Sequence, residues 1–207
     1  MLKFVSKNAF LLGVSATLCV GLVAGVNVLT KTTIAEQTLA QKVALLQEVL
    51  PAGSADTAML TTCVYVQEPT VFGAAATPIY RTTVNSQPIF VVETVAPDGY
   101  SGNIELLAAI TADATILAVR TLKHKETPGL GDKIETQKSD WIKSFDGLQL
   151  QGSDDKRFAV RKDGGQFDQF TGATITPRAV VNAVKRAAVY LQQHPELATQ
   201  AAACQAP

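Results

Sequence analysis

The sequence predicts an α+β protein with one N-terminal transmembrane helix followed by one domain that has a mainly antiparallel sheet and flanking helices. Three features predict this class: a charge-free apolar stretch near the N-terminus, several short β-branched runs separated by turn residues, and a helical pattern of apolar residues after Pro177. The chain has 207 residues, of which the first 30 belong to the apolar end. The remainder is enough for a single well-buried core.

The apolar stretch has the length of a membrane-spanning helix. Residues 8–30 contain no charged side chain, and most positions from Ala9 to Leu29 are apolar. As a helix, this stretch is about 34 Å long, against roughly 30 Å of bilayer hydrocarbon. A cleaved secretory signal is the alternative, but its apolar region is shorter and is followed by a small-x-small site, which is not found here. We therefore expect an uncleaved transmembrane helix over residues 9–29.

The charges around this helix predict its orientation. Lys3 and Lys7 precede the apolar stretch, whereas only Lys31 follows it closely. Basic residues concentrate on the cytoplasmic side of transmembrane helices. Residues 1–8 are therefore expected in the cytoplasm and the bulk of the chain on the other side of the membrane.

The rest of the chain divides by pattern into a stalk, a domain and a tail. Residues 30–51 are expected to form a helical stalk that Pro51 ends, with an apolar stripe that packs on the exported domain. Residues 52–195 form that domain, and the Ala-rich residues 196–207 are expected to be a flexible tail.

Charge and residue counts exclude several kinds of site. Without Lys3 and Lys7 the chain has 16 basic and 18 acidic residues, and no basic cluster that would contact nucleic acid. Two histidines and no Cys-x-x-Cys pair argue against a zinc or iron–sulfur site. Cys63 and Cys204 could pair in an oxidising compartment, but we expect two unpaired thiols because Cys204 lies in the tail.

Five runs predict strands. The signals are weak around Met59–Val66 and Ile79–Val84 and stronger at Ile89–Val95. Ile104–Ile110 and Ile116–Leu122 are expected to form an antiparallel pair joined by a short turn.

A loop with a restricted backbone follows the last of these runs. Its central residues are Thr127, Pro128, Gly129, Leu130 and Gly131. Proline fixes one backbone angle, and the glycines admit conformations and close approaches that other residues do not. Such a loop could press its backbone against a flat ligand, although the pattern taken alone favours an ordinary Pro-Gly turn.

A second motif opens the final helix. Residues 168–178 read D-Q-F-T-G-A-T-I-T-P-R, and apolar residues at helical spacing follow. We expect Thr176 to be the N-cap and Pro177 the first helical residue. Free N–H groups and the helix dipole would favour a phosphate at this end. A capped helix that binds nothing is about as compatible with the pattern.

Together the two motifs resemble a known family. The residues Asp168, Thr171, Gly172, Ala173 and Thr174 form D-x-x-[ST]-G-A-T, and residues 126–131 read E-T-P-G-L-G. In this order, behind one N-terminal span, they resemble the FMN-binding domain of the G subunit of the Rnf (Rsx) ion-translocating electron transport complex. The C subunit of the sodium-pumping NADH:quinone reductase shares the attachment motif but is usually longer.

The resemblance implies a covalent flavin. FMN is expected on Thr174 through a phosphoester bond that a flavin transferase makes with FAD as donor and Mg²⁺. Asp168 would serve recognition by that transferase, and the 127–131 loop would line the flavin ring. The other residues expected around the cofactor are Thr171, Gly172, Ala173 and Thr176.

The expected function is that of an electron-transfer subunit without a complete catalytic site of its own. It would act in an inner-membrane complex that couples electron transfer to ion translocation, with its main domain in the periplasm. The alternatives are a subunit of the sodium-pumping reductase and an anchored ligand-binding or assembly module without redox function. We expect His124 to be a solvated loop residue and Trp141 to pack in the core.

Overall fold

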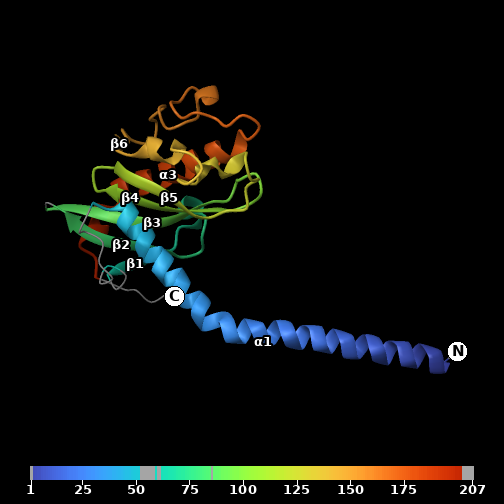
Figure 1. Ribbon diagram of the computed structural model, residues 1–207. Helices are drawn as coiled ribbons and strands as arrows, with labels where there is room; N and C mark the ends of the chain where they lie inside the picture. The colour runs from blue at the N-terminus through green and yellow to red at the C-terminus, as the bar shows by residue number, and fades with distance from the viewer. Residues whose placement is uncertain (1, 52–58, 60–61, 85, 202–207) are drawn as a thin grey trace. The chain divides into compact units, whose positions relative to one another are not determined.

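The computed structural model shows a long N-terminal helix and a sheet-based domain (Figure 1). It describes residues 2–51, 59, 62–84 and 86–201. The chain divides into two compact units, Met1–Lys42 and Val43–Pro207.

The first unit is the main part of helix α1, which runs from Leu2 to Val49. Within it, Ser6–Ile34 is 29 residues long with a mean hydropathy of 2.2, so this segment is long and apolar enough to cross a membrane. The helix expected over residues 9–29 lies inside this segment. Its large apolar side chains are exposed, as a lipid-facing helix requires.

The second unit contains a six-stranded antiparallel sheet in which every strand pairs with the next one along the chain. The predicted strands are confirmed, and the short β6 is an addition. The strands are β1 (Cys63–Val66), β2 (Thr77–Val84), β3 (Gln87–Ala96), β4 (Ile104–Thr111), β5 (Thr115–Lys123) and β6 (Leu148–Gln149).

Both faces of the sheet are buried, which explains the nearly continuous apolar runs in β3 and β4. Phe90 and Val92 of β3 point to the face that helix α3 (Ile175–Gln193) covers (Figure 1). The neighbouring residue Val91 points to the opposite face because side chains alternate along a strand. There it packs in a second cluster with Leu46 and Val49 at the end of α1 and with Leu50, which follows the helix.

The segment between β5 and α3 has little regular structure and is held by aromatic packing. It contains the short 3₁₀ helices η2 (Gly131–Ile134), η3 (Trp141–Phe145) and η4 (Arg161–Asp163). The rings of Phe145 and Phe167 lie 4.4 Å apart, and Phe158 lies 5.8 Å from Phe167. This cluster belongs to the α3 side of the core, so it fixes the loops that carry both motifs.

Two expectations change, one for the thiol of Cys63 and one for the C-terminal tail. Cys63 is buried in β1 and its sulfur is in a disulfide, so the expectation of an unpaired thiol is wrong for Cys63. Cys204 lies outside the described residues. The start of the expected tail contacts the domain, because Leu197 in the 3₁₀ helix η5 (Pro195–Ala198) is buried and its carbonyl accepts a hydrogen bond of 3.0 Å from Nη1 of Arg81.

Candidate functional site

Helix α3 begins two residues earlier than predicted. Its first residue is Ile175 and its N-cap is Thr174, so the prediction that Thr176 caps the helix is wrong. Pro177 is the third helical residue rather than the first. It is tolerated there because the N–H groups of the first turn have no partner within a helix. The Thr174 side chain is exposed and makes no capping hydrogen bond.

The approach to this helix leaves the N-terminus open. Gly172 has φ +82°, a left-handed conformation that glycine adopts at little cost, and the N–H of Ala173 donates to the carbonyl of Phe170 at 3.1 Å. Thr174 therefore directly precedes the first helical turn, whose N–H groups have no partner within the helix. These groups and the helix dipole stabilise a negative charge at that position.

The structure brings the two motifs into contact. A Cβ atom added to Gly172 would lie 3.3 Å from Cδ2 of Leu130, so the two loops touch at these residues. Behind this contact, Oγ1 of Thr176 donates a hydrogen bond of 2.5 Å to Oε2 of Glu126. The loop at 127–131 and the start of α3, which lie far apart in the sequence, therefore form one site.

Glu126 is the centre of this connection, and the motif pattern did not reveal its role. Its side chain is buried, and its Oε1 accepts the N–H of Ser101 at 3.0 Å. A Cβ atom at Gly131 would lie 2.8 Å from Oε2 of Glu126 and 3.0 Å from Oγ1 of Thr176. Glycine at position 131 therefore allows the loop to pass close to the hydrogen bond between Glu126 and Thr176.

His124 is held in place rather than solvated, so that expectation is wrong. Its side chain is only 12% exposed, and its Nε2 lies 2.7 Å from Oε1 of Glu135. The N–H of Glu126 donates to Nδ1 at 3.1 Å. Since Nδ1 accepts, the proton of the neutral ring is on Nε2 and is donated to Glu135. Both ring nitrogens are therefore engaged.

Trp141 and Asp168 connect the second motif to the aromatic cluster. The indole Nε1 of Trp141 donates to the backbone carbonyl of Asp168 at 2.8 Å, and the indole packs edge-on to Phe170 with centroids 5.0 Å apart. Trp141 thus packs against the core as expected. The Asp168 carboxylate is exposed and pairs with Arg161 at 2.9 Å, so it is accessible from solvent.

The residues around Thr174 fit a bound FMN. The open helix terminus suits a phosphate, and Leu130 and Ile175 expose apolar surface beside it, with 41% and 43% of their areas accessible. Two buried polar atoms have no hydrogen-bond partner among the described residues: Oδ1 of Asp132, which directly follows the first motif, and Nε2 of Gln169 in the second. Such atoms are uncommon in folded proteins, and a bound ligand is one explanation.

Comparison with known families agrees with this description of the site. The family model of the FMN-binding domain matches residues 99–189, which include both motifs. The model of the RnfG N-terminal region matches residues 1–49. The fold and the site thus define a membrane-anchored FMN-binding domain protein.

Full-length relatives make the assignment more specific. The chain is 49% identical to the G subunit of the ion-translocating oxidoreductase complex of Escherichia coli K12, over 99% of each chain. It is also 49% identical to the corresponding G subunit of Shewanella loihica, over 92% of this chain and 91% of that protein. The chain belongs to the family of G subunits of ion-translocating oxidoreductase complexes.

A solved structure is similar to part of the chain. It is the C subunit of the Na⁺-translocating NADH-quinone reductase from Parabacteroides distasonis, with 25% sequence identity and a TM-score of 0.45. The similarity covers 56% of this chain and 63% of that one. The full-length relatives assign this chain to the G subunits of ion-translocating oxidoreductase complexes.

Proposed function

We propose that this chain carries FMN covalently on Thr174 and relays electrons within the ion-translocating complex, on the periplasmic side of the inner membrane. One observation carries the proposal: the Thr174 hydroxyl is exposed and makes no capping bond at the open N-terminus of α3. A hydroxyl in this position is accessible to a transferase. A phosphate bonded to it would lie where the N–H groups and the helix dipole stabilise its charge.

The residues of the chain would bind and orient the cofactor. Thr174 and the first turn of α3 would hold the phosphate, while Thr171, Gly172 and Ala173 form the turn beside it. The loop at 127–131 would line the flavin ring, with Leu130 as its apolar contact. Once bound, FMN supplies the redox chemistry, and the protein supplies position and electrostatics.

Neither histidine of the chain is placed to activate the threonine. A secondary hydroxyl is a weak nucleophile near neutral pH and needs a base. His124 is engaged through both ring nitrogens, and Nδ1 of His194 contacts the carbonyl of Tyr190, at the other end of α3. An external flavin transferase with Mg²⁺ would therefore supply the base. In that reaction the Thr174 oxygen forms a bond to the FMN phosphorus of FAD, AMP leaves, and the base takes the hydroxyl proton.

A covalent bond also suits the proposed location. With Lys3 and Lys7 on the cytoplasmic side, the domain lies outside the cytoplasm, where free FMN is expected to be scarce. A reversible site loses its ligand once the free concentration falls below the dissociation constant. A phosphoester removes that dependence, and the exposed Asp168 is available for recognition by the transferase.

In-gel flavin fluorescence tests the proposal. The full chain is co-expressed with the flavin transferase and separated on a denaturing gel. We expect a fluorescent band for the wild type and for T176A, and none for T174A. T83A is the control because Thr83 in strand β2 is an exposed threonine outside both motifs, and its band should remain. A band in T174A together with its loss in T176A would reject Thr174 as the attachment site.

A further inference from the structure

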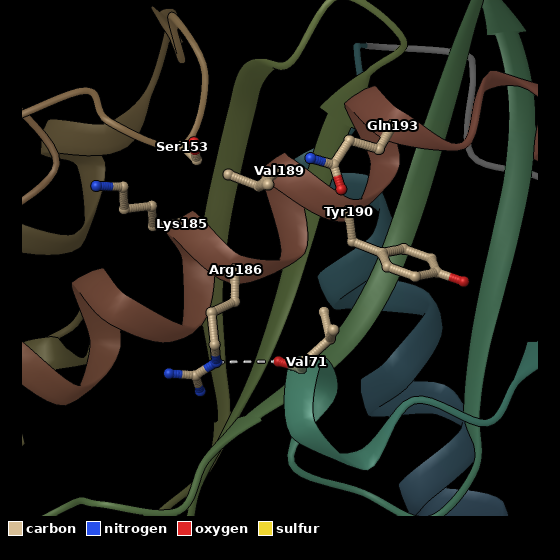
Figure 2. A pocket seen from close by; sticks show the side chains of 7 residues that line it. All are labelled: Val71, Ser153, Lys185, Arg186, Val189, Tyr190 and Gln193. Atoms are coloured by element: carbon tan, nitrogen blue, oxygen red, sulfur yellow. Dashed lines mark hydrogen bonds between the residues drawn. The ribbon is translucent and has the colours of Figure 1, made fainter.

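A groove separate from the flavin motifs lies on the outer side of α3 (Figure 2). Its volume is about 290 Å³, and its apolar lining residues are Val71, Val189 and Tyr190. Val71 comes from the short helix α2 (Pro69–Phe72), whereas the other two lie on the solvent side of α3. Small-molecule sites are commonly about 300–1,000 Å³, so this groove is at the lower limit and suits a single large side chain.

Two cations line the same groove. Nζ of Lys185 donates to the carbonyl of Asp155 at 3.1 Å, and Nε of Arg186 donates to the carbonyl of Val71 at 3.1 Å, the bond drawn in Figure 2. Both acceptors are neutral, and neither cation makes an ion pair with a residue that the structure describes. The groove therefore combines apolar walls with two positive charges that form no ion pair with a described residue.

The charges of α3 as a whole support this description. The helix contains Arg178, Lys185 and Arg186 but no acidic residue. Arg178 is neutralised because its guanidinium binds the Asp163 carboxylate through contacts of 2.6 and 2.9 Å. The uncompensated positive charge of the helix is thus concentrated beside the groove.

The end of the groove at Tyr190 lies near negative charges rather than positive ones. Burial and the nearby charges of Glu68 and Glu196 raise the pKa of the Tyr190 hydroxyl. A ligand carboxylate is therefore favoured near Lys185 and Arg186 and disfavoured near the Tyr190 hydroxyl. This polarity gives the groove a preferred orientation for its occupant.

We propose that this groove binds an acidic segment of another subunit of the complex. An apolar side chain of the segment would fill the space between Val71, Val189 and Tyr190, and its Asp or Glu carboxylates would pair with Lys185 and Arg186. A partner subunit is available because the chain belongs to a subunit family of a multi-subunit complex. The inference rests on that membership and not on the flavin bond.

Photo-crosslinking in the intact membrane complex tests the contact directly. A benzophenone amino acid replaces Val189 in the groove or, as the matched control, the exposed Thr83 in strand β2, which does not line the groove. We expect the Val189 probe to crosslink to another subunit of the complex, in a peptide that contains Asp or Glu, and the Thr83 probe to give at least tenfold less of this product. An adduct only with lipid, only with a second copy of this chain, or with no subunit would overturn the proposal.

Charge variants provide a second, independent readout. In K185Q/R186Q we expect at least tenfold less co-purification with the complex at moderate salt. The wild-type association should weaken as salt is raised, because salt screens exposed charges. The control K138Q/K162Q removes two exposed lysines that do not line the groove and should retain association. Flavin fluorescence at Thr174 should be unchanged in both variants, which separates this test from that of the proposed function. Equal co-purification of both double variants would contradict the proposal.

Discussion

The hydroxyl of Thr176 donates a 2.5 Å hydrogen bond to the Glu126 carboxylate, and this bond joins the two sequence motifs across 50 residues. Both side chains are buried. The bond orients the start of α3 relative to the loop at 127–131. It therefore determines where the Thr174 hydroxyl lies relative to the loop proposed to line the flavin.

Replacement of Thr176 tests the contribution of this bond to stability. T176V keeps the shape of the side chain but leaves Oε2 of Glu126 buried without this donor. An unsatisfied buried polar group costs about 1–3 kcal/mol, and more when it is charged, so the free energy of unfolding should fall by at least that amount. T176S keeps the hydroxyl and should lose about 1 kcal/mol through the missing methyl group. Urea unfolding measures both, and equal stability of the two variants would contradict the role of the bond.

Gly131 should not tolerate a side chain. In G131A the new Cβ would lie 2.8 Å from Oε2 of Glu126 and 3.0 Å from Oγ1 of Thr176, so the loop or the hydrogen bond must shift. We expect a loss of about 1–3 kcal/mol, typical of overpacking, together with reduced flavin attachment.

The matched control is G129A. Gly129 has φ +78° but nothing within 4 Å of an added Cβ atom, so the cost there comes from the backbone alone. That cost is about 1–2 kcal/mol for a left-handed conformation. We therefore expect G129A to leave the Glu126–Thr176 bond intact. Thermal unfolding and in-gel fluorescence compare the variants, and full attachment in G131A would argue against close packing at this point.

Asp155 should make part of the stability depend on pH. A hydrogen bond from the Arg157 guanidinium, supported by the N–H groups of Gln151 and Arg157, holds the pKa of the Asp155 carboxyl well below its ordinary value. A lowered folded-state pKa stabilises the fold above the unfolded-state pKa of about 3.9. This contribution is lost as the pH falls toward the folded-state pKa.

The comparison with D155N isolates this effect. At neutral pH, D155N should have a lower free energy of unfolding than the wild type, and the difference should shrink below about pH 4. Urea unfolding at several pH values measures it. D163N is a useful comparison because Asp163 also has a lowered pKa through its hydrogen bond with Arg178 but lies on the exposed surface. A difference between wild type and D155N that grows as the pH falls would contradict the assignment.

Local patterns were sufficient to predict most of the fold. The β-branched runs predicted β1 to β5. A buried strand needs β-branched and apolar residues regardless of which strand it pairs with, so this signal is local. The two-residue β6 and the 3₁₀ helices were not predicted. They depend on packing around Phe145 and Phe167 rather than on a repeating pattern.

The errors at the site came from contacts between distant residues. Thr174 and Thr176 are both suitable N-caps, and sequence alone does not show that Glu126 binds the second of them. His124 lies between two lysines, which favoured a solvated residue, yet Glu135 and the Glu126 N–H bind both of its nitrogens. Asp155 and the groove beside Lys185 had no motif at all, since their partners come from separate segments.

The mass of the peptide that contains Thr174, measured on protein matured in its native membrane, tests the central claim most directly. Fragmentation should place one FMN, less one water, on Thr174 and leave Thr171 and Thr176 unmodified. A Thr174 peptide found without the cofactor, or with it on another residue, would contradict covalent attachment at this position.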